Sequence, residues 1–318
     1  MARNLAHGLA ARTDGASQLW LYDTDAARAG ELKSEMSAAA AAAAAAAGHD
    51  GLDVRVASGL GEVRANAETV LLSLPSEAAG EAVLSELLEG GGGGGDDSSP
   101  IARVVDMGTV SPAYSSASSA KCHNAGVAYL DAPVSGGPEG ADAGTLSVMV
   151  GGDEAEVDLL RPLVFDAIGS YVVHLGGSGA GTAAKLVNQQ LVGIHAAAAC
   201  EAMTMARSLG IKDLAPLLEL LDRSWGNSFI LQRVGGVLLE AQRSADDGAL
   251  MTSGAPIRNL KKDMGIVDGA AEATGLTLGV SSAAKAIFDE GGRAPPMADA
   301  DFAALTLLLD PTKEAPQK

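Results

Sequence analysis

The sequence predicts two domains, a doubly wound α/β domain with a largely parallel sheet followed by an all-helical domain. The first half alternates short apolar runs with helical patterns, which is the βαβ rhythm of a parallel sheet. From Thr182 onward the strand pattern stops and helical periodicity continues almost to the end. With 318 residues, of which 47% are hydrophobic, the chain is long enough to bury two cores. We expect the first domain over residues 1–178 and the second over residues 179–318.

Seven apolar, β-prone runs predict the strands of the first domain. In chain order they cover residues 18–22, 53–57, 69–74, 103–107, 127–134, 147–151 and 171–176. The helices of the second domain are predicted over residues 182–209, 213–222, 229–243, 256–274, 280–289 and 299–309. A further helical pattern opens the chain, beginning at Met1-Ala-Arg-Asn-Leu-Ala.

Two low-complexity stretches interrupt the first domain. One is the alanine tract 38–47, and the other is the glycine run and its polar continuation, 90–99. Both fall between predicted elements or extend the end of a helix. We therefore expect solvent-facing insertions that carry no chemistry.

Charge and composition restrict the classes of partner. The formal net charge is -18, so nucleic acid and anionic membranes would be repelled at long range. No apolar run reaches the length of about 20 residues that crosses a bilayer, and neither a signal peptide nor a transit peptide is visible. Cys122 and Cys200 give neither a disulfide framework nor a metal-binding spacing. We expect a soluble, intracellular protein without a bound metal, in the cytosol or in a mitochondrion.

A substrate site is predicted where a buried strand ends in glycines. Ser135, Gly136 and Gly137 should form an exposed turn beyond that strand. Without glycine side chains, backbone amides there can approach a carboxylate closely, and the Ser135 hydroxyl adds a donor. Lys185 and Asn188, spaced i, i+3 on a helix, point into one volume. This combination suits the binding and oxidation of a small hydroxy acid.

Asp23 is the candidate for recognition of a dinucleotide. It follows the predicted strand 18–22, and an acid at the end of the second strand of a dinucleotide-binding fold accepts hydrogen bonds from the ribose hydroxyls. The same carboxylate repels a 2′-phosphate, which favours NAD over NADP. The alternative role for Asp23 is that of a helix N-cap.

A dinucleotide-binding fold also needs a first strand and a Gly-x-Gly-x-x-Gly turn that holds the pyrophosphate at a helix N-terminus. Met1 already stands in a helical pattern of the kind that follows such a turn. Two explanations stay open. Either the natural chain starts upstream and this one is truncated, or the protein has lost the first strand and its phosphate-binding turn.

Five motifs follow one another along the chain: Asp106-Met-Gly-Thr-Val-Ser-Pro112, Leu130-Asp-Ala-Pro-Val-Ser-Gly-Gly137, Gly144-Thr-Leu-Ser-Val-Met149, the segment from Gly181 through Lys185 to Asn188, and Lys262-Asp263. In this order they resemble the β-hydroxyacid dehydrogenases typified by 3-hydroxyisobutyrate dehydrogenase. The resemblance covers nearly the whole chain. It implies a Rossmann-type domain followed by a helical domain of the 6-phosphogluconate dehydrogenase C-terminal type.

Three further stretches look more like the L-threonate dehydrogenase branch of this family: Val187-Asn-Gln-Gln-Leu-Val-Gly-Ile-His195, Gly226-Asn-Ser228 and Lys262-Asp-Met-Gly-Ile-Val267. The resemblance implies that Lys185 is catalytic and assists proton transfer at the substrate hydroxyl. Burial beneath the bound cofactor would favour the neutral amine that this role requires. The implied substrate-binding residues are Ser135, Gly136, Gly137, Asn188 and Gln189. Gln189 stands where an asparagine often follows Asn188, a difference that bears on substrate choice.

The cofactor contacts implied by the resemblance fall on Leu74, Pro75, Thr109 and Lys262, beside Asp23. The cofactor is NAD, with NADP possible. We interpret His195 as a packed, neutral histidine rather than a substrate contact. The family also implies a homodimer or homotetramer. Two alternatives to the hydroxy acid dehydrogenase remain: a non-catalytic truncated homologue that only folds and oligomerises, and an enzyme for 6-phosphogluconate-like substrates, for which no phosphate-binding cluster is evident.

Overall fold

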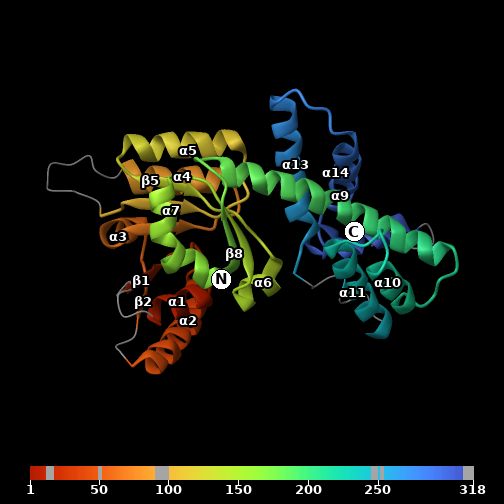
Figure 1. The fold of residues 1–318 in the computed structure, drawn as a ribbon, viewed down its shortest axis with the longest axis horizontal. Coiled ribbons are helices and arrows are strands. Elements are labelled where there is room, and N and C mark those ends of the chain that lie inside the picture. Colours follow the sequence, from red (N-terminus) through yellow and green to blue (C-terminus); the bar gives the residue numbers. More distant parts are fainter. Residues whose placement is uncertain (12–17, 49–51, 90–99, 245–249, 251–253, 311–318) are drawn as a thin grey trace. The chain divides into compact units, whose positions relative to one another are not determined.

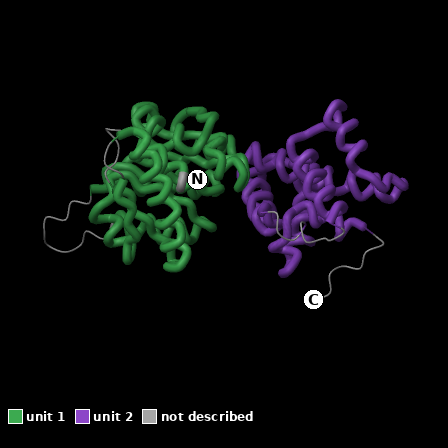
Figure 2. Tube along the Cα trace, turned by 90° about the horizontal axis from the view of Figure 1, so that it is seen from below, with its two compact units in different colours: residues 1–185 green, residues 186–318 purple. Residues whose placement is uncertain are grey.

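The structure is a computed structural model that describes all residues except 12–17, 49–51, 90–99, 245–249, 251–253 and 311–318. The chain forms two compact units, Met1–Lys185 and Leu186–Lys318, coloured separately in Figure 2. The division falls within α9 (Ala180–Ser208), a helix that runs from one unit into the other. The functional division at residue 178 that the sequence predicts remains our proposal.

The described residues of the first unit form the strands β1 to β8, and each of the seven predicted runs has a counterpart among them (Figure 1). They are β1 (Gln18–Leu21), β2 (Asp53–Val56), β3 (Thr69–Leu72), β4 (Arg103–Asp106), β5 (Ala128–Asp131), β6 (Val134–Ser135), β7 (Leu146–Val150) and β8 (Gly169–His174). The predicted strand 127–134 is divided, because β5 pairs with β4 and β6 turns away to pair antiparallel with β7. Pro133, which lacks a backbone donor, lies at this division.

The parallel strands form separate ladders. One joins β1 to β2, a second has the order β3-β4-β5, and a third has the order β6-β7-β8 with β7 and β8 parallel. Among the described residues, no ladder joins β1 to β3.

The helices of the first unit cover these sheets. They are α1 (Ala2–Ala10), α2 (Ala26–Ala47), α3 (Leu60–Asn66), α4 (Glu77–Glu89), α5 (Pro112–Asn124), α6 (Gly137–Ala143), α7 (Glu154–Leu160), the π-helix η1 (Arg161–Phe165) and the short α8 (Asp166–Ile168). The alanine tract 38–47 is the second half of α2. Its predicted exposure is wrong for one face, because Ala40 and Ala43 are buried in one core with Leu5 and Leu9 of α1. The second low-complexity stretch, 90–99, lies outside the described residues.

The second unit is helical, as predicted. After α9 come α10 (Ala215–Asp222), α11 (Phe229–Ser244), α13 (Ile257–Ala273), α14 (Gly279–Gly291), the 3₁₀-helices η2 (Met297–Asp299) and η3 (Phe302–Ala304), and α15 (Leu305–Leu309). The single helix predicted over 299–309 is wrong. Asp301 interrupts it, because this buried carboxylate accepts hydrogen bonds from the Ala303 and Ala255 N–H groups and pairs with Arg233.

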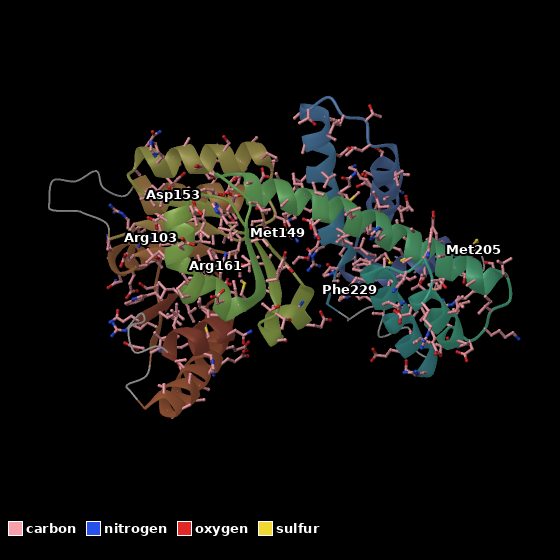
Figure 3. The ribbon with its side chains drawn as sticks, viewed as in Figure 1. Arg103, Met149, Asp153, Arg161, Met205 and Phe229 are labelled. Atoms are coloured by element: carbon pink, nitrogen blue, oxygen red, sulfur yellow. The ribbon has the colours of Figure 1, made fainter. Side chains whose placement is uncertain are left out.

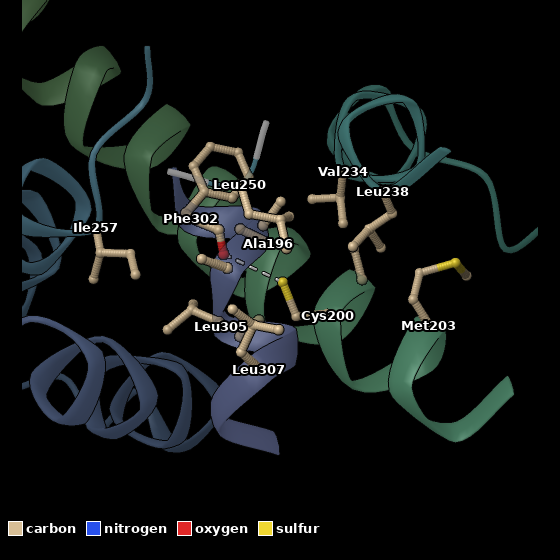
Figure 4. Packing of buried hydrophobic residues seen from close by; sticks show 14 of the residues in the cluster. Ala196, Cys200, Met203, Val234, Leu238, Leu250, Ile257, Phe302, Leu305 and Leu307 are labelled. Atoms are coloured by element: carbon tan, nitrogen blue, oxygen red, sulfur yellow. Dashed lines mark hydrogen bonds between the residues drawn. The ribbon is translucent and has the colours of Figure 1, made fainter. Parts of the chain in front are cut away.

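A continuous apolar core fills the second unit (Figure 4). Phe302 and Leu305 lie in it beside Cys200 of α9, whose Sγ is 3.5 Å from the Phe302 carbonyl oxygen. Cys122 and Cys200 are both buried and unpaired, and burial raises the pKa of each thiol to about 12. Among the described residues, no helix is both long and apolar enough to cross a membrane.

Candidate active site

The carboxyl ends of β3, β4 and β5 meet at one edge of their parallel sheet. Residues there are aligned in register, with Leu72 opposite Asp106 and Asp106 opposite Asp131. This is the edge at which open α/β sheets bind ligands. The structure therefore brings three of the predicted cofactor residues to it, Leu74 and Pro75 after β3 and Thr109 after β4.

The loops at this edge are closely packed. A Cβ added to Gly108 would stand 3.0 Å from Asp106 Oδ1 and 3.9 Å from the Leu74 carbonyl oxygen. The Gly108 N–H donates to Asp106 Oδ1 over 2.8 Å. Burial raises the pKa of the Asp106 carboxyl, against hydrogen bonds from Gly108 and Tyr129 that lower it. The backbone around Asp106 is thus closely packed, and a side chain at residue 108 would require the Asp106 carboxylate to shift.

Asp23 follows β1 and is exposed. Its Oδ1 accepts a hydrogen bond from the Asp25 N–H over 2.9 Å. The N-cap of α2 is Asp25, whose side chain accepts from the Ala27 and Arg28 N–H groups. The alternative role of Asp23 as the helix cap is therefore wrong, and its carboxylate stands exposed at the carboxyl end of β1.

The predicted glycine turn begins in β6. Ser135 is the half-buried last residue of that strand, and the exposed Gly136 and Gly137 lead into α6. Gly136 has φ of 138° and Gly137 has φ of 66°, backbone conformations that side chains other than glycine rarely adopt. The two glycines thus shape an open turn directly after Ser135.

Lys185 reaches the same strand from α9. Its side chain is buried, with 7% exposed, and its Nζ donates to the Val134 carbonyl oxygen over 2.8 Å. Val134 immediately precedes Ser135. The amine predicted to transfer protons is therefore held at the strand residue that directly precedes Ser135 and the two glycines predicted to bind the substrate.

Asp131 was not predicted as a site residue, although it stands in the motif that ends in these glycines. Its side chain is buried at the end of β5 and accepts two backbone hydrogen bonds from the start of α9, from Gly179 at 2.7 Å and from Thr182 at 2.6 Å. The available signal was an aspartate in an otherwise apolar strand, where a buried carboxylate needs partners.

A second polar group lies in the helical unit. Asn188 Nδ2 donates to Gln189 Oε1 over 3.0 Å, and Gln189 Nε2 donates to Asp263 Oδ2 over 2.5 Å. Lys262 Nζ lies 3.2 Å from the other Asp263 oxygen. The structure thus joins the predicted residues Asn188, Gln189 and Lys262 through Asp263, which the sequence analysis quoted in a motif without a role.

His195 is exposed on α9, so its interpretation as a packed histidine is wrong. It follows Val187 and Leu191 at intervals of four residues, and both of these are exposed as well. Residues at this spacing share one face of a helix, and here that face is the exposed one.

Two family models match consecutive parts of the chain. Residues 6–176 match the NAD binding domain of 6-phosphogluconate dehydrogenase. Residues 179–309 match a domain described as the NAD-binding domain of NADP-dependent 3-hydroxyisobutyrate dehydrogenase. The change from one model to the next falls at the start of α9.

Individual relatives match over most of the chain. The chain is 34% identical to the NAD-dependent L-serine dehydrogenase of Pseudomonas aeruginosa, over 66% of this chain and 69% of that protein. It is 32% identical to the 2-(hydroxymethyl)glutarate dehydrogenase of Eubacterium barkeri, over 77% and 76%. Among solved structures, Mycobacterium tuberculosis 3-hydroxyisobutyrate dehydrogenase with L-serine is 25% identical and superposes with a TM-score of 0.74, covering 97% of this chain and 94% of that one.

Proposed function

Because the chain belongs to the 3-hydroxyisobutyrate dehydrogenase family of NAD(P)-dependent β-hydroxyacid dehydrogenases, we propose that Lys185 is the proton-transfer group with which it oxidises a small β-hydroxy carboxylate. Family members transfer a hydride between small hydroxy acids and a nicotinamide cofactor. The observation that carries the assignment of Lys185 is its buried Nζ, 2.8 Å from the Val134 carbonyl oxygen and next to Ser135.

The residues at the carboxyl edge suit a nicotinamide cofactor. An exposed carboxylate at Asp23 can accept from ribose hydroxyls, and the loops that contain Leu74 and Thr109 follow neighbouring strands. Asp23, Leu74, Pro75, Thr109 and Lys262 would hold the cofactor. The chemistry that the cofactor supplies is acceptance of the hydride from the carbon that bears the substrate hydroxyl.

The chain's own residues do the rest. Ser135 and the backbone amides of Gly136 and Gly137 would donate hydrogen bonds to the substrate carboxylate. Lys185 Nζ would take the proton of the substrate hydroxyl as the hydride leaves, so that the hydroxy acid becomes the oxo acid. Asn188, one helical turn after Lys185 on α9, would orient the substrate.

Gln189 would act on the substrate through Asn188. Asp263 accepts from Gln189 Nε2, which leaves Gln189 Oε1 to face Asn188 Nδ2. A carboxylate can only accept, so the orientation of both amides follows from Asp263. Gln189 would therefore influence substrate choice by holding Asn188.

The experiment is turnover by the purified chain, followed by the formation of reduced cofactor. L-Threonate, 3-hydroxyisobutyrate and L-serine are compared at saturating NAD and NADP, with 6-phosphogluconate as the test of the phosphorylated alternative. We expect turnover of an unphosphorylated hydroxy acid, a preference for NAD, and preference for L-threonate over 3-hydroxyisobutyrate. A folded chain with no turnover of any of them would instead support the non-catalytic alternative.

Self-association through the helical unit is also proposed. Large apolar side chains are exposed there. Met205 on α9 is 60% exposed and Phe229 at the start of α11 is 93% exposed; both are labelled in Figure 3. An interface between copies of the chain would remove such apolar side chains from water. Light scattering during size-exclusion chromatography should give the molar mass of a dimer or tetramer. The double variant Met205→Glu with Phe229→Glu should have a lower mass, closer to that of the monomer. A monomeric parent would overturn this proposal.

A further inference from the structure

We propose that Asp131 is a positioning residue for Lys185. Its carboxylate, together with glycine contacts at residues 151 and 181, holds the first turn of α9 against β5 and β7 and so sets where the amine lies. The inference rests on the role proposed for Lys185. It assigns a task to a residue that touches neither the substrate nor the reacting atoms.

The carboxylate of Asp131 is fully engaged by the helix. Oδ1 accepts from the Gly179 N–H and Oδ2 from the Thr182 N–H, residues 48 and 51 positions further along the chain. The first N–H groups of a helix have no partner within the helix, and a negative charge at this end is favourable. Helix caps are usually local in sequence, whereas this cap comes from another element and therefore fixes the helix to the sheet.

The second observation is the closeness of the backbones. A Cβ added to Gly181 would collide with the carbonyl oxygens of Met149 and Asp131, from β7 and β5 (Met149 is labelled in Figure 3). A Cβ added to Gly151 would stand 2.6 Å from Asp131 Oδ1 and 2.8 Å from the Gly181 backbone nitrogen. Real Cβ atoms essentially never approach other atoms so closely, so the helix lies this near the strands only because both positions are glycine.

The third observation is that Lys185 itself contacts the segment that begins at Asp131. The segment that starts at Asp131 also contains Val134, whose carbonyl oxygen accepts from Lys185 Nζ. Thus one four-residue segment holds both the start of α9 and the Lys185 amine about one turn further along the helix. A displacement of the helix start by about 1 Å would carry the amine with it, and a misplacement of that size can cost about a hundredfold in rate.

The test compares two methyl additions in one glycine-rich segment. Gly181→Ala introduces the colliding carbon, whereas Gly177→Ala adds a carbon with nothing within 4 Å. Asp131→Asn keeps the side-chain shape but places an NH₂ group against one of the two backbone N–H donors. Each variant is checked for folding by circular dichroism and thermal unfolding, and Gly181→Ala carries the test if Asp131→Asn does not fold.

Two readouts separate positioning from general destabilisation. The first is steady-state kinetics: kcat should fall at least about tenfold in Asp131→Asn and Gly181→Ala, with the KM for NAD within about twofold of the parent. The second requires no activity. Labelling of amines by an acylating reagent, followed by mass spectrometry of the Lys185 peptide, should be at least about fivefold faster in these two variants, because a buried amine becomes exposed.

Gly177→Ala should match the parent in both readouts. Folded Asp131→Asn and Gly181→Ala proteins with parental kcat and parental Lys185 labelling would overturn the proposal. If the parent turns over no hydroxy acid, or if Lys185→Ala leaves its turnover unchanged, the proposed function fails, while the labelling comparison still tests how Lys185 is held.

Discussion

Two adjacent turns of α9 carry the residues of the proposed chemistry, and they are held in different ways. Lys185 follows a helix start whose backbone N–H groups donate to the Asp131 carboxylate and whose glycines leave no room for a side chain against the strands. Asn188 is held by side chains, through Gln189 and Asp263.

The two kinds of contact have different consequences for substitution. Contacts made by the backbone and by glycine tolerate few substitutions, so the position of the amine is constrained. A chain of side-chain hydrogen bonds can be altered one residue at a time. We infer that the proton-transfer geometry of this chain is fixed by its fold, whereas its substrate preference is adjustable at residues such as Gln189.

The largest effect is expected from removal of the Lys185 amine. Lys185→Ala should lower kcat at least about a hundredfold, the usual scale for loss of a proton-transfer group. The fold should persist, because the helix start is held by Asp131 and not by Lys185. Steady-state kinetics checks this, with Lys33→Ala, an exposed lysine on α2, as the control. Activity within about tenfold of the parent would remove Lys185 from the mechanism.

The side-chain network is tested next. Gln189→Leu removes both amide hydrogen bonds at similar volume and leaves Asp263 without its amide donor. A hydrogen bond to a charged group is worth about 1.5–3 kcal/mol, so the KM for the hydroxy acid should rise at least about tenfold, with a smaller change in kcat. Gln190→Leu, the next residue of α9, is the matched control. Equal effects of the two substitutions would show that Gln189 does not hold Asn188.

Asp23 differs from both Lys185 and Asn188, because its carboxylate is exposed. Asp23→Ser should narrow the preference for NAD over NADP by about tenfold, because it removes the charge that repels a 2′-phosphate. Asp25→Ser is the control, since serine also caps helices and the substitution removes a charge two residues away. The ratio of kcat/KM for the two cofactors measures both. A parent enzyme with equal efficiency for NAD and NADP would contradict the role of Asp23.

The smallest effect is expected at Asp106, the last residue of β4. Burial raises the pKa of this carboxyl in the folded chain, so the folded state holds its proton to higher pH than the unfolded state does. The free energy of unfolding should therefore fall as pH rises from the ordinary aspartate pKa, about 3.9, through the raised folded value. Asp106→Asn should gain in Tm relative to the parent across that window. Exposed Asp158→Asn is the control, and a pH-independent difference in Tm at Asp106 would contradict the shift.

Local sequence patterns predicted the elements well where the pattern was continuous. The strand 103–107 and the helix 182–209 differ from β4 and α9 by at most two residues at either end. The prediction of one helix over 299–309 was wrong because Asp301 binds backbone and side-chain groups far away in the sequence. The periodicity of a segment does not reveal such distant partners. The prediction that the tract 38–47 faces solvent was wrong for Ala40, because the residues that bury it belong to a separate helix.

The candidate site shows the same limit. The motifs located Lys185, Ser135 and the glycines, since turn glycines and a helical amine are visible one at a time. They gave no role to Asp131 or Asp263, because each acts on a residue at least 48 positions away. Such pairings become visible only when the chain is folded.

The most direct measurement of the central claim compares Gly181→Ala with Gln189→Leu in the same assay. If backbone contacts set the chemistry and side chains set the substrate, Gly181→Ala lowers kcat at least about tenfold while the KM for the hydroxy acid stays within about threefold, and Gln189→Leu does the reverse. Two folded variants that shift the same kinetic parameter by similar factors would contradict the claim.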